Sequence, residues 1–195
     1  MIPYTVETAS GLVVDLVTPT PETINIRDIA WSLSRLARYN GHTLGDFPYS
    51  VAQHSCWVAN RVMSKTNDKS FALYALLHDA HEAYTGDMVS PMKWLDRLSH
   101  IIKDIEFSLQ QAIHTAVDMP PTRKAVRDAI KQADKEALAV EAYHLMPSRG
   151  RDWNLPVVSD DLLNAFESPL APIDAYGLFL RTWEQLNTPQ LQEVG

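Results

Sequence analysis

The chain has few of the features that mark secreted or membrane-spanning proteins. Its 195 residues include one cysteine, Cys56, so no internal disulfide can form and a reducing compartment is indicated. No apolar run reaches the length of a membrane span, and the N-terminus lacks the basic-then-apolar pattern of a secretory signal. Low-complexity segments and repeats of fixed period are also absent. We therefore expect a cytoplasmic protein without a membrane partner.

The charge balance is acidic, with a formal net charge of −7. This balance argues against a surface that binds nucleic-acid polymers. It does not exclude a nucleotide substrate, because a metal ion and a few local cations can balance phosphate charge. The length suffices for a substantial core, and we expect one domain over residues 1–195.

Apolar residues recur at helical spacing along most of the chain, which predicts a mostly α bundle. Weak alternation over residues 3–17 predicts a short N-terminal β-hairpin. The expected helices run from an Asn25 cap to Asn40-Gly41, over about 50–64 and 69–84, from Ser90-Pro91 to about 117, from a Thr122 cap through Val140, and over about 173–187. Residues 147–172 are rich in Pro, Asp, Ser and Asn, which predicts a long irregular connection.

The most informative stretch is residues 78–87, HDAHEAYTGD. His78 and Asp79 stand side by side in an apolar run that we expect to be helical. Glu82 follows at a spacing that places it on the same side as the pair. Gly86 is where such a helix would end, and Asp87 then enters a loop. Carboxylates and imidazole against an apolar helix are costly unless they coordinate or pair.

Two further helices carry residues of the same kind. His54 lies near the apolar stripe of the helix that Ser50 can cap, with Gln53 able to close a capping box. Asp134 lies beside an apolar stripe in a later helix. The order is therefore His, then His-Asp, then Asp, each on its own helix.

Two imidazoles and two carboxylates are a suitable ligand set for one divalent ion. Four protein ligands leave open positions on an octahedral metal, which suits Mn²⁺, Co²⁺, Fe²⁺, Ni²⁺ or Zn²⁺ without choosing among them. The spacing alone leaves a second interpretation open. In that interpretation His54 is a hydrogen-bonded core histidine, and Asp134 pairs with Lys131 or Lys135.

The pattern His54, His78-Asp79 and Asp134 resembles the HD-domain superfamily of metal-dependent phosphohydrolases. The segments LSRLARYNGHT, YSVAQHS, LLHDAHEAYTGDMVSPMK and KQADKEAL are similar to its 5'-deoxynucleotidase-like and phage nucleotide phosphohydrolase branches. The resemblance covers about residues 25–145 and implies an HD-type helical bundle. It implies that one divalent metal is bound by four residues: His54, His78, Asp79 and Asp134.

The resemblance also implies roles around the metal. Glu82 matches the carboxylate that orients or deprotonates the attacking water or protonates the leaving group, and Asp87 matches a residue near the scissile phosphate and sugar. Arg38 matches a phosphate-binding arginine, and Lys93 recurs where it could face phosphates. Tyr39 stands where deoxynucleotidases place an aromatic residue beside the sugar and base. That residue is a tryptophan in the nearest enzymes, so sugar and base preference is left open. Trp153, in the irregular connection, is the aromatic residue that we expect to cover the site.

The activity so implied is hydrolysis of (deoxy)nucleoside 5'-monophosphates to nucleoside and phosphate by metal-activated water. One alternative is a (deoxy)nucleoside triphosphate phosphohydrolase or triphosphohydrolase. Another is a non-catalytic nucleotide-binding regulatory module. A cyclic-nucleotide or alarmone hydrolase ranks lower, because such enzymes usually bring extra histidine ligands or partner domains. By resemblance, and from the long apolar face of the 91–117 helix, we expect a homodimer.

Overall fold

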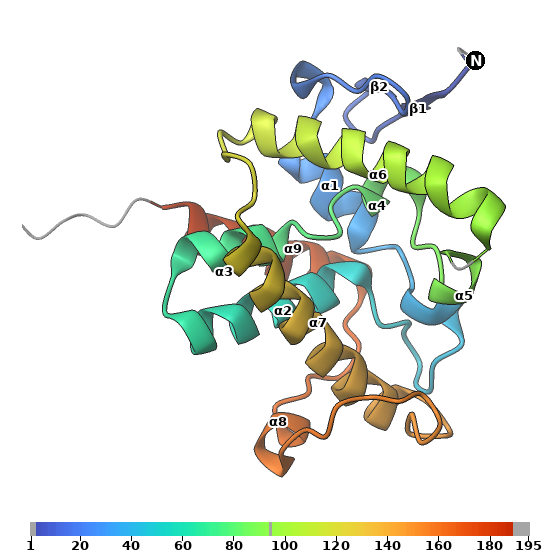
Figure 1. Cartoon of the computed structure of the whole chain (residues 1–195), viewed down its shortest axis with the longest axis vertical. Helices are drawn as coiled ribbons and strands as arrows, with labels where there is room; N and C mark the ends of the chain where they lie inside the picture. The colour runs from blue at the N-terminus through green and yellow to red at the C-terminus, as the bar shows by residue number, and fades with distance from the viewer. Residues whose placement is uncertain (1–2, 94, 189–195) are drawn as a thin grey trace, which may run out of the picture.

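The computed structural model describes residues 3–93 and 95–188. The chain forms a mostly helical bundle with a small two-stranded antiparallel sheet at its start, as the sequence predicts (Figure 1). The sheet pairs β1 (Thr5–Glu7) with β2 (Val13–Asp15). The α-helices are α1 (Ile26–Leu33), α2 (Val51–Thr66), α3 (Lys69–Leu76), α4 (Glu82–Thr85), α5 (Ser90–Lys93), α6 (Asp96–Ala116), α7 (Lys124–Leu145), α8 (Asp160–Asn164) and α9 (Pro172–Asn187).

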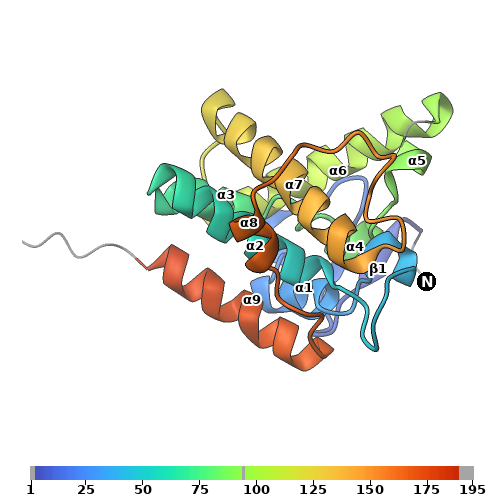
Figure 2. The same ribbon diagram turned by 90° about the horizontal axis from the view of Figure 1, so that it is seen from below.

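Helix α2 is the centre of the bundle. It packs against α3, α7 and α9, and Figure 2 shows it between α7 and α9. Ser50 caps its start by accepting a hydrogen bond from the Gln53 backbone N–H, as predicted. The Gln53 side chain does not close a capping box. It donates to the Ser168 carbonyl and accepts from the Leu170 N–H, which ties α2 to the connection before α9.

Several predicted helix boundaries are wrong. Helix α1 begins after the Asn25 cap but ends at Leu33, and the Arg38–Gly41 segment forms a separate 3₁₀ turn, η2. Leu95 has an extended backbone and separates α5 from α6, so no single helix runs from Ser90 to 117. Arg123, not Thr122, precedes α7, and no side chain caps it.

The predicted irregular connection is present over residues 147–171, with the short helix α8 inside it. It runs alongside α7 before the chain enters α9 (Figure 2). Within the described residues no helix is both long enough and apolar enough to span a membrane.

Asp28 fastens the N-terminal hairpin to α1. Its carboxylate is buried and accepts hydrogen bonds from the Thr8 hydroxyl at 2.7 Å, the Ser10 N–H at 3.0 Å and the Ser10 hydroxyl at 2.5 Å. Hydrogen bonds to a charged group are stronger than those between neutral groups, and Asp28 accepts three of them.

We predict that Asp28→Ala lowers the free energy of unfolding by about 3 kcal/mol, measured by urea denaturation. The matched control is Asp174→Ala. Asp174 occupies the same third position of α9 but is exposed, so both variants lose the same helix-dipole contribution. Equal losses in the two variants would contradict the fastening role of Asp28.

Candidate metal centre and active site

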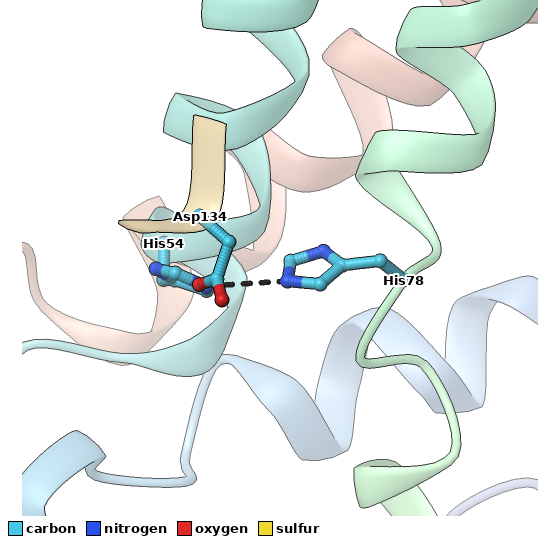
Figure 3. Close-up of side chains that lie close together, drawn as sticks. All are labelled: His54, His78 and Asp134. Atoms are coloured by element: carbon cyan, nitrogen blue, oxygen red, sulfur yellow. Dashed lines mark hydrogen bonds and ion pairs between the residues drawn. The ribbon is translucent and has the colours of Figure 1, made fainter. Parts of the chain in front are cut away.

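Three elements bring the predicted metal-binding residues together. His54 lies in the first turn of α2, His78 and Asp79 lie in the turn after α3, and Asp134 lies in the middle of α7. Figure 3 shows the side chains of His54, His78 and Asp134 pointing toward one another. Their potential ligand atoms all lie within 4.8 Å of one another. Residues far apart in the sequence thus form one cluster of imidazole and carboxylate groups.

The distances in this cluster fit a shared ion. His54 Nε2 lies 3.3 Å from His78 Nε2 and 3.2 Å from Asp134 Oδ1. Asp79 Oδ2 lies 3.1 Å from His78 Nε2 and 3.5 Å from His54 Nε2. Ligands about 2.1 Å from one metal are about 3.0 Å apart in octahedral and about 3.4 Å apart in tetrahedral geometry. The donor types and their separations therefore suit a divalent metal ion.

The turn that carries His78 and Asp79 is not the continuous 69–84 helix that the sequence predicts. Helix α3 ends at Leu76, and α4 begins at Glu82. Between them the backbone hydrogen bonds link residues three apart, from Ala80 N–H to Leu77 O and from Glu82 N–H to Asp79 O. Neighbours on a regular helix point about 100° apart. Here the Asp79 carboxylate comes within 3.1 Å of the His78 ring.

The charges in the cluster stabilise one another. Burial lowers the pKa of His78, but the Asp79 and Asp134 carboxylates outweigh burial and raise that pKa to about 9. Burial raises the pKa of Asp79, yet the histidines and Arg38 hold it far below its ordinary value. The pKa of Asp134 is lowered in the same way, mainly by His54 against the effect of burial. Both carboxylates are therefore ionised at neutral pH.

The pKa of Glu82 shifts in the opposite direction to those of Asp79 and Asp134. Glu82 is buried at the start of α4, and burial raises its pKa to about 9, with Asp79 and Asp87 adding to the shift. Its Oε2 atom has no hydrogen-bond partner among the described residues. Burial also raises the pKa of Asp87, with Asp79 adding and Arg38 and Lys93 opposing. Glu82 thus carries a proton at neutral pH in this structure.

Arg38 and Tyr39 meet a residue that the sequence analysis did not single out, Glu141 on α7. Arg38 Nε donates to Glu141 Oε2 at 2.8 Å, and the Tyr39 hydroxyl donates to the same oxygen at 2.7 Å. Among the described residues, no hydrogen bond occupies the terminal guanidinium nitrogens of Arg38. Those nitrogens remain available to an anion, while Nε anchors the side chain.

The backbone of this segment is strained. Tyr39 and Asn40 have φ values of 56° and 52°, in the left-handed region. This region costs about 1–2 kcal/mol for a residue with a side chain, and such strain clusters at functional sites. The two hydrogen bonds to Glu141 help to offset that cost. The Trp153 ring lies against Tyr39, with centroids 6.0 Å apart, so it stands beside the predicted sugar-side residue.

Lys93 is the cation that forms an ion pair with Glu82. Its Nζ is 3.7 Å from Glu82 Oε1 and 3.0 Å from Glu106 Oε1. Burial lowers the pKa of Lys93, but Glu106 outweighs it and raises that pKa. Lys93 is therefore charged and already paired.

Glu141 and Glu106 are the site residues that the sequence analysis missed. Glu141 comes seven residues after Asp134, so both lie on one face of α7. An acid in the apolar run ALAVEAYHL could have signalled a buried partner. Glu106 carries no such signal, because Lys103 and Asp104 precede it and mark a charged stretch of α6.

Comparison with known proteins identifies the family. The profile of the family described as "5'-deoxynucleotidase YfbR-like" matches residues 35–145. An uncharacterized protein of Rhodobacter capsulatus is 39% identical over 140 residues, which cover 70% of each chain. The uncharacterized protein YfdR of Escherichia coli K12 is 36% identical over 166 residues, 84% of this chain and 85% of YfdR. The chain belongs to the YfbR-like 5'-deoxynucleotidase family of HD-domain phosphohydrolases.

We predict that Mn²⁺ or Co²⁺ raises the thermal unfolding temperature of the metal-stripped protein. Binding to the native state at about 100 times Kd adds about 2.7 kcal/mol to the free energy of unfolding. Asp134→Asn should abolish the shift, because Asp134 supplies one oxygen of the cluster. Asp128→Asn, an exposed change on the same helix, should keep it. An undiminished shift in Asp134→Asn would place the ion elsewhere.

Metal affinity should rise with pH. At neutral pH the His78 ring carries a proton in the metal-free protein, because its pKa is about 9. A ligand imidazole must be neutral, so binding has to displace that proton. Affinity is therefore weakest at low pH and increases until pH exceeds about 9. Calorimetry in two buffers of different ionisation enthalpy measures the proton released, and binding without proton release at pH 7 would contradict this prediction.

Proposed function

We propose that the protein hydrolyses (deoxy)nucleoside 5'-monophosphates to nucleoside and phosphate. The observation that carries the proposal is the convergence of His54, His78 and Asp134, with the Asp79 carboxylate against both imidazoles and the buried Glu82 nearby. Membership of the 5'-deoxynucleotidase family supports the same class of reaction.

In this proposal His54, His78, Asp79 and Asp134 hold one divalent ion. Such an ion supplies Lewis-acid chemistry, since it offsets phosphate charge and lowers the pKa of water. The ligand chemistry admits Mn²⁺, Co²⁺, Fe²⁺, Ni²⁺ or Zn²⁺. The negative charge of the two aspartates and the exposed edge of the cluster, where Asp134 is 44% accessible, suit a cation with room for substrate.

The neighbouring side chains bind the substrate and donate the proton. Arg38 binds the phosphate through its terminal nitrogens, which Nε holds in place. Glu82 carries the proton that the departing sugar oxygen requires, on a carboxyl group with one unpartnered oxygen. Asp87 borders the scissile phosphate and the sugar, and Tyr39 with Trp153 borders the sugar and base. Lys93 contributes positive charge 3.7 Å from Glu82 Oε1.

The charge balance favours monophosphates over triphosphates. Arg38 is paired with Glu141, and Lys93 is paired with Glu106. Little positive charge is therefore left over to balance a triphosphate, which carries about four negative charges. A monophosphate carries only about two negative charges, so it needs less positive charge from the metal ion and Arg38.

One observation favours the triphosphate alternative. A cavity of about 340 Å³ has His78 and Asp134 among its lining residues. Arg127 and Lys131 also line it, and neither has an ion-pair partner among the described residues. A longer phosphate chain that extended into this cavity would meet both cations. Substrate profiling distinguishes the two functions.

The test is phosphate and nucleoside release from all nucleoside and deoxynucleoside mono-, di- and triphosphates, with the stripped protein reloaded with each metal. We predict turnover of monophosphates. Glu82→Gln should lower kcat by about 10²–10⁴-fold, because the amide cannot donate or accept the transferred proton. Asp79→Asn should also abolish turnover, and Asp128→Asn should retain it.

Two other results of this assay would contradict the proposal. Turnover of triphosphates alone would replace the proposal with the alternative, and the product would show which bond breaks. Nucleotide binding without turnover under any metal would identify a regulatory module instead.

A further inference from the structure

Glu141 is the most completely bonded acidic group near the candidate site. Its side chain is 2% exposed and uses both oxygens. Oε1 accepts a hydrogen bond from His54 Nδ1 at 2.6 Å. Oε2 accepts from Arg38 Nε at 2.8 Å and from the Tyr39 hydroxyl at 2.7 Å. One carboxylate therefore contacts a candidate metal ligand and both residues of the candidate substrate-binding segment.

The contact with His54 fixes which ring nitrogen faces the cluster. An ionised carboxylate only accepts hydrogen bonds, so Nδ1 of His54 must donate. When the ring is neutral, as a metal ligand must be, the lone pair is therefore on Nε2, which faces the cluster 3.2 Å from Asp134 Oδ1. The His54 side chain is fully buried, so solvent cannot replace Glu141 as the acceptor. His78 is fixed in the same manner by the backbone, since its Nδ1 lies 2.7 Å from the Ala75 carbonyl oxygen.

The contact of Glu141 with Arg38 and Tyr39 fixes the candidate substrate-binding segment. These residues lead into a left-handed turn, with φ of 56° at Tyr39 and 52° at Asn40. Both side chains reach back to one oxygen of Glu141, which holds the turn against α7. The Arg38 backbone N–H also bonds the Tyr49 carbonyl, so the main chain is held at the residue before the turn.

We propose that Glu141 is a positioning residue that holds the ligand tautomer of His54 and the Arg38–Tyr39 segment in one arrangement. Metal affinity and substrate affinity then depend on the same carboxylate, although Glu141 touches neither metal nor substrate. The substrate half of this inference rests on the proposed function, and the metal half does not.

The test compares Glu141→Gln with Glu136→Gln, a matched change on the same helix. Glu136 is also buried and accepts three hydrogen bonds, from Arg61, Lys65 and Gln132, but it does not contact the cluster. A glutamine at 141 has one oxygen acceptor, so it cannot serve both His54 and the Arg38–Tyr39 pair. Circular dichroism and thermal unfolding establish that both variants fold.

Direct titration with Mn²⁺ is the first readout, because it needs no substrate. Glu141→Gln should weaken Mn²⁺ binding by about 10–100-fold, the usual effect of losing a ligand's supporting hydrogen bond. Glu136→Gln should bind Mn²⁺ within about twofold of the wild type. The visible spectrum of the Co²⁺-loaded protein should also change in Glu141→Gln alone.

Substrate kinetics form the second readout. At saturating Mn²⁺, Glu141→Gln should raise KM for the best nucleotide, and Glu136→Gln should leave it unchanged. A folded Glu141→Gln variant with wild-type Mn²⁺ affinity would overturn the inference, as would an equal loss in Glu136→Gln. A wild-type protein that binds no Mn²⁺, Co²⁺ or Zn²⁺ would overturn it as well. If the wild type binds metal but turns over no nucleotide, the proposed function fails while the Mn²⁺ titration still decides the role of Glu141.

Discussion

The imidazole of His54 is the group on which the charged interior of this bundle depends. Its Nε2 lies within 3.5 Å of carboxylate oxygens from both Asp79 and Asp134, and its Nδ1 bonds Glu141. Carboxylates withdrawn from water need a partner, and these three, one buried and two half-buried, come from two different segments of the chain. Without the ring between them, they would face one another across a low-dielectric interior. The packing of α2 against α7 is therefore tied to the electrostatics of the site.

Glu82 shows how the same environment produces the opposite protonation state. Among the described residues Glu82 forms no ion pair with an imidazole, and its ion-pair partner Lys93 is 3.7 Å away and closer to Glu106. Burial and the neighbouring Asp79 therefore dominate, and Glu82 takes up a proton. One small volume thus holds ionised carboxylates and a neutral carboxylic acid. Pairs of titratable groups whose pKa values are pushed apart in this way are typical of acid–base chemistry.

Much of the fold could be predicted from local signals in the sequence. The hairpin, the Asn25 and Ser50 caps and the irregular connection after α7 depend on neighbouring residues, and the structure has them. The errors occur where tertiary contacts override periodicity. The apolar run before Tyr84 is equally compatible with a helix and with a helix followed by tight turns. The His78 Nδ1 contact with the Ala75 carbonyl belongs to the turn. The contacts made by His78 and Asp79 in the cluster, which the sequence does not show, distinguish the continuous helix from the helix followed by turns.

The candidate metal ligands could be predicted because their residue types and their order in the sequence form a pattern. The residues that hydrogen-bond to those ligands could be found only from the three-dimensional structure. Glu141 is 87 residues from His54 and 103 from Arg38, so no local pattern links them. Helical spacing does supply one signal. An acid seven residues after Asp134 returns to the same face of α7 after two turns. Glu136, two residues after Asp134, faces away and pairs with Arg61 and Lys65. Position relative to the last candidate ligand, more than charge, therefore separates an acid that supports the site from one that only stabilises the bundle.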